Sequence, residues 1–224
     1  MTTHTPSQPS ARRPAPLALL VLLLALLASA CAPSTSTAAV SRGLETQPDG
    51  WRGLPLDVER SMPEVTLLDT DDQPVELAAH TAGSPTLLFF GYTSCPDMCQ
   101  VHLSAIASAM RDAGVSTSDL DVVFVSVDPE RDTPERIEEW LSYFDRGVLG
   151  LHEDLEVVEV ALSALDLPGP IVEGPDPRGE GDLIGHPAQV IGFDAAGNAR
   201  RVWPFGARRA DWISDLPLIV EQWS

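Results

Sequence analysis

Two of the chain's cysteines, Cys95 and Cys99, lie four positions apart in "GYTSCPDMCQ", directly after an apolar run. Two thiols at this spacing could form a redox couple, bind a metal ion or join in a structural disulfide. Pro96 is typical of a first helical position, and Asp97 would lie beside the positive end of that helix. If the helix begins at Pro96, the cysteines form an i, i+4 pair on one face, and the helix N-terminus lowers the thiol pKa. We therefore expect Cys95 and Cys99 to form a reactive or metal-binding site and not only to pack in the core.

The spacing of this pair favours a metal site over the other uses. A dedicated dithiol oxidoreductase normally shows C-x-x-C after its strand, whereas three residues separate Cys95 from Cys99. A peroxidatic cysteine would act largely alone, which would leave the second cysteine unexplained. Soft thiolates select Cu(I) or zinc, and a structural zinc site needs four ligands. Because the chain offers these two thiols plus histidines, copper fits its ligands better than zinc.

The third cysteine, Cys31, follows two arginines and an apolar stretch that is too short to span a bilayer comfortably. "LASAC" resembles a lipobox, in which the signal is removed before the cysteine and the cysteine is lipidated. Ordinary cleavage nearby, with loss of Cys31, is the alternative. We predict that residues 1–30 are a lipoprotein signal peptide and that residues 31–50 are a flexible, lipid-anchored tether, rich in Ser, Thr, Ala, Pro and Gly. The expected location is extracytoplasmic, with the protein tethered to the cell membrane.

Acidic side chains dominate the charge of this chain. It has 33 Asp and Glu residues against 14 Arg and no Lys, which gives a net charge of −19. Such a charge repels nucleic acid and favours cations or basic protein surfaces. The sequence therefore predicts no nucleic-acid partner.

Residues 51–224 suit one domain with a core of its own. Residues 64–80 alternate loosely around a turn, which predicts a β-hairpin that leads into the domain. Two continuous apolar runs, 85–92 and 120–128, predict buried strands, and a segment of helical period follows each. Strand, helix, strand and helix in this order imply parallel strands joined by right-handed crossovers, and therefore an α/β fold.

The second half of the domain continues this alternation. Residues 148–167 are expected to form a third strand and a third helix. Residues 168–182, "PGPIVEGPDPRGEGD", are rich in Pro and Gly, and we expect an irregular loop there. Residues 188–205 predict a hairpin. Residues 208–223 predict a closing helix, which Pro217 should kink or divide.

Three motifs together resemble the Sco (SenC) family: "FFGYTSCPDMC", "VSVDPERDTPER" and a histidine within "DLIGHPAQVIGFDAAGNARRVWPFG". The similarity runs from Pro63 to the C-terminus. The resemblance implies a thioredoxin-like fold, with a central mixed sheet flanked by helices and the N-terminal hairpin as an extension. It also implies that Cys95, Cys99 and His186 bind copper, as Cu(I) or Cu(II). Members of the family assist assembly of the binuclear copper centre of cytochrome c oxidase.

Some positions depart from the family pattern. Ser94 and Gln100 stand where the family commonly has His and Pro. Gly185 and Pro187 flank His186, where the family usually has Asp and Thr, and loss of that carboxylate weakens support for the imidazole. Thioredoxin-like redox enzymes place a cis-proline just before the strand that faces their cysteines, and Pro187 precedes such a strand. A cis bond at Pro187 would indicate thiol–disulfide exchange.

Two further polar residues could take part in the site. Asp128 ends the second strand, and we expect it near Cys95 because strand ends gather ligands in open α/β sheets. A hard carboxylate suits Cu(I) poorly, so Asp128 is expected to support the site without binding the metal. His102 lies three residues after Cys99, and we expect it to flank the site, with direct ligation as the less favoured interpretation.

The sequence leaves two main functions open. In the first, the protein is a copper metallochaperone and not an enzyme, and its partner is subunit II of cytochrome c oxidase. In the second, Cys95 and Cys99 are a redox pair, and the protein is a thiol–disulfide reductase. It would keep the copper-site cysteines of the oxidase, or of a partner chaperone, reduced. Another extracytoplasmic copper chaperone or a thioredoxin-like reductase would then be a further partner. A redox-buffering or peroxidase-like role is the weakest hypothesis.

Overall fold

The computed structural model describes residues 43–144 and 147–224. The predicted signal peptide and Cys31 lie outside these residues, as does the predicted tether up to residue 42. The tether's last residues, 43–50, lie against the domain, where Leu44 packs on the core and Asp49 pairs with Arg201. Within the described parts of the chain, none of the helices combines the length and apolar character that a membrane crossing requires.

A mixed sheet forms the centre of the domain. Its strands are β1 (Leu54–Pro55), β2 (Thr66–Asp69), β3 (Pro74–Glu76), β4 (Thr86–Gly91), β5 (Asp121–Ser126), β6 (Val148–His152), β9 (Val190–Phe193) and β10 (Ala199–Trp203). They lie in the order β1-β10-β9-β4-β5-β6-β2-β3. The strands β4, β5 and β6 are parallel, as the alternation of strands and helices predicts. The strand β9 runs antiparallel to β4, so the start of β9 lies beside the end of β4.

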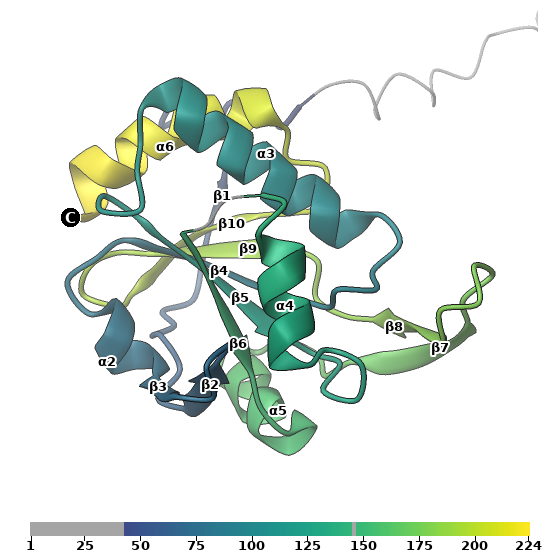
Figure 1. The fold of residues 1–224 in the computed structure, drawn as a ribbon. Helices are drawn as coiled ribbons and strands as arrows, with labels where there is room; N and C mark the ends of the chain where they lie inside the picture. Colours follow the sequence, from purple (N-terminus) through teal and green to yellow (C-terminus); the bar gives the residue numbers. More distant parts are fainter. Residues whose placement is uncertain (1–42, 145–146) are drawn as a thin grey trace, which may run out of the picture. The chain divides into compact units, whose positions relative to one another are not determined.

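Helices cover both faces of this sheet. They are α2 (Leu77–Thr81), α3 (Met98–Ala113), α4 (Pro134–Leu141), α5 (Leu155–Ala164) and α6 (Arg209–Trp223). Figure 1 shows α3 and α6 side by side along one face and α5 on the opposite side. The helix α4 shares the face of α3, because Trp140 packs on Phe124 with ring centroids 5.1 Å apart and Phe124 also contacts Phe89. Thr133 caps α4 by accepting a hydrogen bond from the Arg136 backbone N–H, and Pro134 is its first residue.

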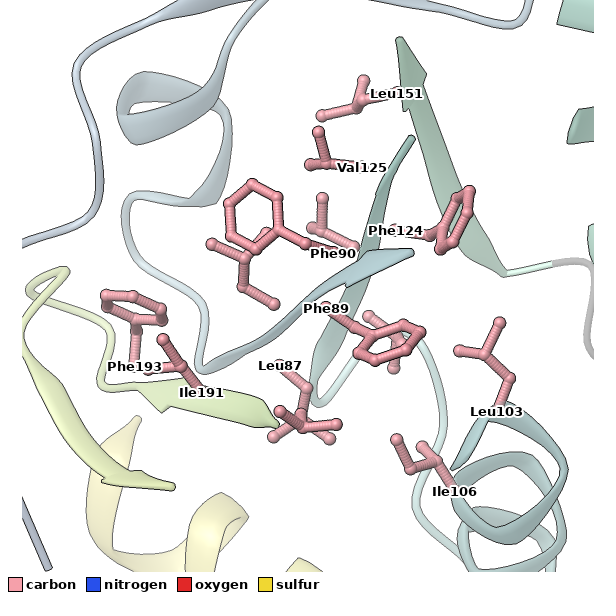
Figure 2. Close-up of a cluster of buried hydrophobic side chains, with 14 of the residues drawn as sticks. Leu87, Phe89, Phe90, Leu103, Ile106, Phe124, Val125, Leu151, Ile191 and Phe193 are labelled. Atoms are coloured by element: carbon pink, nitrogen blue, oxygen red, sulfur yellow. The ribbon is translucent and has the colours of Figure 1, made fainter. Parts of the chain in front are cut away.

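The core follows the alternation of side chains along β4, all of whose residues are buried. In Figure 2, Leu87 and Phe89 point toward Leu103 and Ile106 of α3, whereas Phe90 points to the other side of the sheet, with Val125 and Leu151. A continuous apolar run is required here because helices cover both faces of the strand.

Three local predictions are wrong. The helix α3 begins at Met98 and not at Pro96, because the Cys95 N–H donates to the Tyr92 carbonyl at 3.1 Å and closes a turn ahead of the helix. Residues 168–182 are not an irregular loop, since β7 (Ile171–Pro175) pairs with β8 (Asp182–Gly185) around a turn whose glycines adopt positive φ. The helix α6 runs through Pro217 without a break, so the expected division at this proline is wrong; Leu216 before it and Ile219 two residues after it are fully buried.

Candidate metal centre

The topology brings three potential ligands to one edge of the sheet. The loop that carries Cys95 follows the end of β4, and Cys99 lies in the first turn of α3. His186 lies between β8 and β9, and β9 starts beside the end of β4 because the two strands are antiparallel. The carboxyl ends of parallel strands are where open α/β sheets place their ligands.

These three residues lie close enough together to hold one metal ion. The sulfur atoms of Cys95 and Cys99 and one ring nitrogen of His186 all lie within 4.8 Å of one another. Cys99 Sγ lies 3.5 Å from His186 Nε2, although the residues are 87 positions apart in sequence. Both cysteines are buried and neither forms a disulfide. His186 is half-buried, so the cluster is shielded from solvent and still accessible from the side of the histidine.

The orientation of the His186 ring suits ligation through Nε2. Its Nδ1 lies 3.0 Å from the backbone carbonyl of Pro187. When Nδ1 carries the proton and donates it to this carbonyl, the Nε2 lone pair is free and faces Cys99. The Pro187 carbonyl thus supports the imidazole in place of the carboxylate whose absence at position 185 was expected to weaken that support. The Tyr92 ring packs edge-on against the imidazole, with centroids 5.5 Å apart.

The two thiols have opposite pKa shifts. A hydrogen bond from Cys99 lowers the pKa of Cys95 to about 4, with a further contribution from His186 and against the effect of burial. Burial raises the pKa of Cys99 well above its ordinary value, and the neighbouring Cys95 adds to that rise. At neutral pH the apo pair is therefore one thiolate, on Cys95, that accepts a hydrogen bond from one thiol, on Cys99.

Two polar side chains that sequence reasoning missed hold the cysteine loop, and one of them, Asp132, is buried. The Asp132 carboxylate accepts hydrogen bonds from the Thr93 N–H at 3.0 Å and from the Ser126 hydroxyl at 2.6 Å. The Arg136 guanidinium donates to the Thr93 hydroxyl at 2.7 Å and to the Ser94 hydroxyl at 2.9 Å. Asp132 and Arg136 both belong to the segment "DPERDTPER", in which only Asp128 was predicted to support the site.

A cavity of about 410 Å³ opens beside the cluster, between the cysteine loop and the β7–β8 hairpin. The residues around it include Tyr92, Cys95, Met98, Ile171, Ile184 and His186. Its wall is largely apolar, and it carries two of the three potential ligands. A metal ion or a partner side chain can therefore reach the cluster through this cavity.

The predictions for Asp128, His102 and Pro187 have different outcomes in the structure. The Asp128 carboxylate is buried and accepts a hydrogen bond from Arg131 Nε, and no hydrogen bond joins it to the cysteines within the described residues. His102 is buried between Phe89 and Phe205, and burial lowers its pKa to about 4, so its ring is neutral. The hypothesis of a cis bond at Pro187 is wrong, because all peptide bonds of residues 43–144 and 147–224 are trans.

Comparison with known proteins gives a consistent result. The family model SCO1/SenC matches residues 56–221. A protein of Stutzerimonas stutzeri is 36% identical over 116 residues, which is 51% of this chain and 56% of that protein. The chain thus spans about half the length of this relative, and smaller shares of the other curated relatives that it matches.

Solved structures resemble the whole domain. The structure of Bradyrhizobium japonicum ScoI with copper bound has a TM-score of 0.59 and 27% identity, over 75% of this chain and 98% of that one. BsSco, described as a member of the Sco family of cytochrome c oxidase assembly proteins with a disulfide switch, has a TM-score of 0.56 and 19% identity, over 75% and 98%. These neighbours confirm the predicted thioredoxin-like α/β fold with a central mixed sheet.

Proposed function

The chain belongs to the SCO1/SenC family, and from this premise we propose that it is an extracytoplasmic copper metallochaperone that assists assembly of the binuclear copper centre of cytochrome c oxidase. The observation that carries the proposal is the cluster of Cys95, Cys99 and His186, whose ligand atoms lie within 4.8 Å of one another. The copper-bound Bradyrhizobium neighbour and the assembly role given to the Sco family of BsSco support it.

The donor set fits copper in either oxidation state. Two thiolates at buried positions suit Cu(I), and the imidazole Nε2 adds the nitrogen ligand that Cu(II) favours. The Cys95 thiolate is available at neutral pH, whereas Cys99 must release its proton when a metal binds. Uptake of copper is therefore coupled to release of one proton from Cys99.

Subunit II of cytochrome c oxidase is the partner that this function requires. We place the protein outside the cytoplasm, held to the membrane by a lipid on Cys31, so that its cavity can meet a membrane-bound oxidase. The net charge of −19 favours a basic surface on the partner and opposes nucleic acid.

The test is a copper titration of the reduced protein with Cu(I) and with Cu(II), each in competition with a chromophoric chelator. We expect the wild type to bind one copper ion per chain in each titration. Cys95→Ala and Cys99→Ala should each abolish binding of both Cu(I) and Cu(II). His186→Ala should weaken Cu(II) binding at least ~10-fold and leave Cu(I) binding nearly unchanged. A wild-type protein that takes up no stoichiometric copper would refute the proposal.

A thiol–disulfide reductase is the second candidate, and the low pKa of Cys95 favours it. The Cys95 thiolate would attack a disulfide of the oxidase or of another copper chaperone, and Cys99 would then displace the reduced target as Cys95–Cys99 closes. The target disulfide is thus reduced to two thiols while Cys95 and Cys99 are oxidised to a disulfide. A thioredoxin-like reductase would then reduce Cys95 and Cys99 again. The trans bond at Pro187 removes one argument for this role. Catalytic amounts of the protein, with a thioredoxin-like reductase and its electron donor present to re-reduce Cys95 and Cys99, should reduce an oxidised copper-site domain if this role is correct.

A further inference from the structure

Arg131 joins the end of β5 to the β7–β8 hairpin. Its guanidinium donates from Nε to the Asp128 carboxylate, from Nη1 to the Glu180 carbonyl at 2.8 Å and from Nη2 to the Asp182 carbonyl at 2.8 Å. We propose that Arg131 is a positioning residue that clamps this hairpin and thereby holds His186 opposite Cys99. The inference deepens the proposed copper function and rests on it for its effect on metal binding.

The connection from the clamp to His186 is short. Asp182 is the first residue of β8, and β8 ends at Gly185, directly before His186. Farther along the strand, the Ile184 N–H donates to the Tyr92 hydroxyl at 3.3 Å, and the Arg131 guanidinium lies 5.5 Å from the centre of the Tyr92 ring. The strand that leads to His186 is therefore tied to the rigid sheet at its beginning and near its end.

The hairpin needs such an attachment. It forms a two-stranded sheet of its own, separate from the central sheet. Ile171 and Val172 of β7 are 64% and 71% exposed, so the outer strand contributes little buried apolar area. An isolated two-stranded hairpin is marginally stable in water, and contacts with the rest of the domain must fix its position.

The Arg131 guanidinium occupies the space that a side chain at Gly181 would fill. This glycine has φ of +97°, and a Cβ atom placed there would lie 2.7 Å from Arg131 Nη1. Any side chain would displace the guanidinium from the two carbonyls that it binds. Gly179, in the same turn, has φ of +82° and open space around its Cβ position. It therefore offers a control with similar backbone strain and no contact with Arg131.

The chemistry of the clamp requires arginine and assigns a role to Asp128. A planar guanidinium donates to three acceptors in fixed directions, whereas a lysine ammonium is a single point of charge. The Asp128 side chain is only 6% exposed and balances the charge of Arg131, whose side chain is 23% exposed. Asp128 thus acts on the site through Arg131 and the hairpin.

The experiment compares Arg131→Gln and Gly181→Ala with Gly179→Ala and with Arg200→Gln, an exposed arginine near the far end of the sheet. The first measurement is hydrogen exchange of the metal-free protein. Residues 171–185 should exchange at least ~10-fold faster in Arg131→Gln and Gly181→Ala, because local opening follows the loss of hydrogen bonds. Arg200→Gln should exchange like the wild type, and Gly179→Ala should show only the smaller increase that backbone strain at its positive φ causes.

The second measurement is the affinity of the same variants for Cu(II) and for Cu(I). We expect Cu(II) binding to weaken ~10- to 100-fold in Arg131→Gln and Gly181→Ala, as is usual when support for a metal-binding histidine is lost. Cu(I) binding should change less than ~3-fold, since the thiolates stay in place. Because the clamp acts through His186, the loss of Cu(II) affinity in His186→Ala is the upper limit for the loss in the clamp variants.

The outcomes separate the two proposals. Unchanged exchange in Arg131→Gln, or equal losses of Cu(II) and Cu(I) affinity, would overturn the clamp. Loss of protection in Gly179→Ala as large as in Gly181→Ala would assign the effect to backbone strain and would also overturn it. A wild-type protein without copper affinity would refute the metallochaperone function, while the exchange measurement would still decide whether Arg131 holds the hairpin.

Discussion

Gly91 and Cys99 are in direct contact across the site. A Cβ atom at Gly91 would lie 2.8 Å from Cys99 Sγ and 3.0 Å from atoms of the Phe89 and Phe124 rings. The last residue of β4 must therefore be glycine for the sulfur to occupy its place over the end of the strand. This close approach fixes the Cys99 sulfur by packing against the sheet, since Cys99 is fully buried.

Gly91→Ala should displace Cys99 Sγ and weaken copper binding in both oxidation states. We expect a loss of at least ~10-fold in affinity and a destabilisation of about 1–3 kcal/mol from overpacking. Chelator competition and urea unfolding measure the two effects. Gly169→Ala is the control, because its Cβ would meet only the flexible end of Glu159 at 3.1 Å. Wild-type affinity in Gly91→Ala would show that the sulfur has freedom to move.

The pKa shift of Cys95 predicts an unusual pH profile for alkylation of the metal-free protein. A pKa of about 4 keeps Cys95 as thiolate while the pH falls from 8 to 5, so its reaction rate with iodoacetamide should stay nearly constant over that range. An ordinary thiol, with a pKa of about 8.5, falls from about 50% thiolate at pH 8.5 to about 0.1% at pH 5.5. Mass spectrometry identifies the modified residue.

Two variants complete this alkylation experiment. Cys99→Ala removes the hydrogen bond that contributes most to the shift, so the pKa of Cys95 should rise and its rate should fall at acidic pH. Cys95→Ala should react slowly throughout, since the pKa of the buried Cys99 is raised. A wild-type rate that falls tenfold per pH unit below pH 8 would contradict the assigned thiolate.

The features that the sequence predicted are those set by strong local patterns. Buried apolar runs and their order specify the parallel strands β4, β5 and β6, and topology then requires that Cys95 and the residues before β9 meet at one edge. The proximity of His186 to the cysteines was inferred from family resemblance, and the 3.5 Å contact with Cys99 agrees with it.

The features that escaped prediction depend on tertiary contacts. The β7–β8 hairpin lies in a segment rich in Pro and Gly, and two of its carbonyls accept hydrogen bonds from Arg131, which lies about 50 residues earlier after the end of β5. The role of Asp132 was likewise hidden, since its partners Thr93 and Ser126 come from two different strand ends. No local period encodes such long-range hydrogen bonds.

Pro217→Ala should stabilise the domain, because α6 continues through this proline undivided. The proline lacks the N–H that would bond to the preceding turn, and an interior proline costs a helix about 3 kcal/mol relative to alanine. Its side chain is exposed, so its replacement removes little packing. We expect a gain of about 1–3 kcal/mol in the free energy of unfolding by urea, with copper binding unchanged. A loss of stability would show that the proline relieves strain in α6.

Asp132→Asn should disorder the cysteine loop, since the Asp132 carboxylate accepts hydrogen bonds from Thr93 and Ser126. An amide turns an N–H₂ group toward donors that need an acceptor, and a buried unsatisfied donor costs about 1–3 kcal/mol. We expect that loss of stability together with weaker binding of both Cu(I) and Cu(II), because Thr93 precedes Cys95 by two residues. Asp71→Asn, on an exposed turn, is the matched control and should leave both measurements unchanged. If Asp132→Asn loses stability but keeps full copper affinity, the loop does not position Cys95, and the site depends on α3 and the β7–β8 hairpin alone.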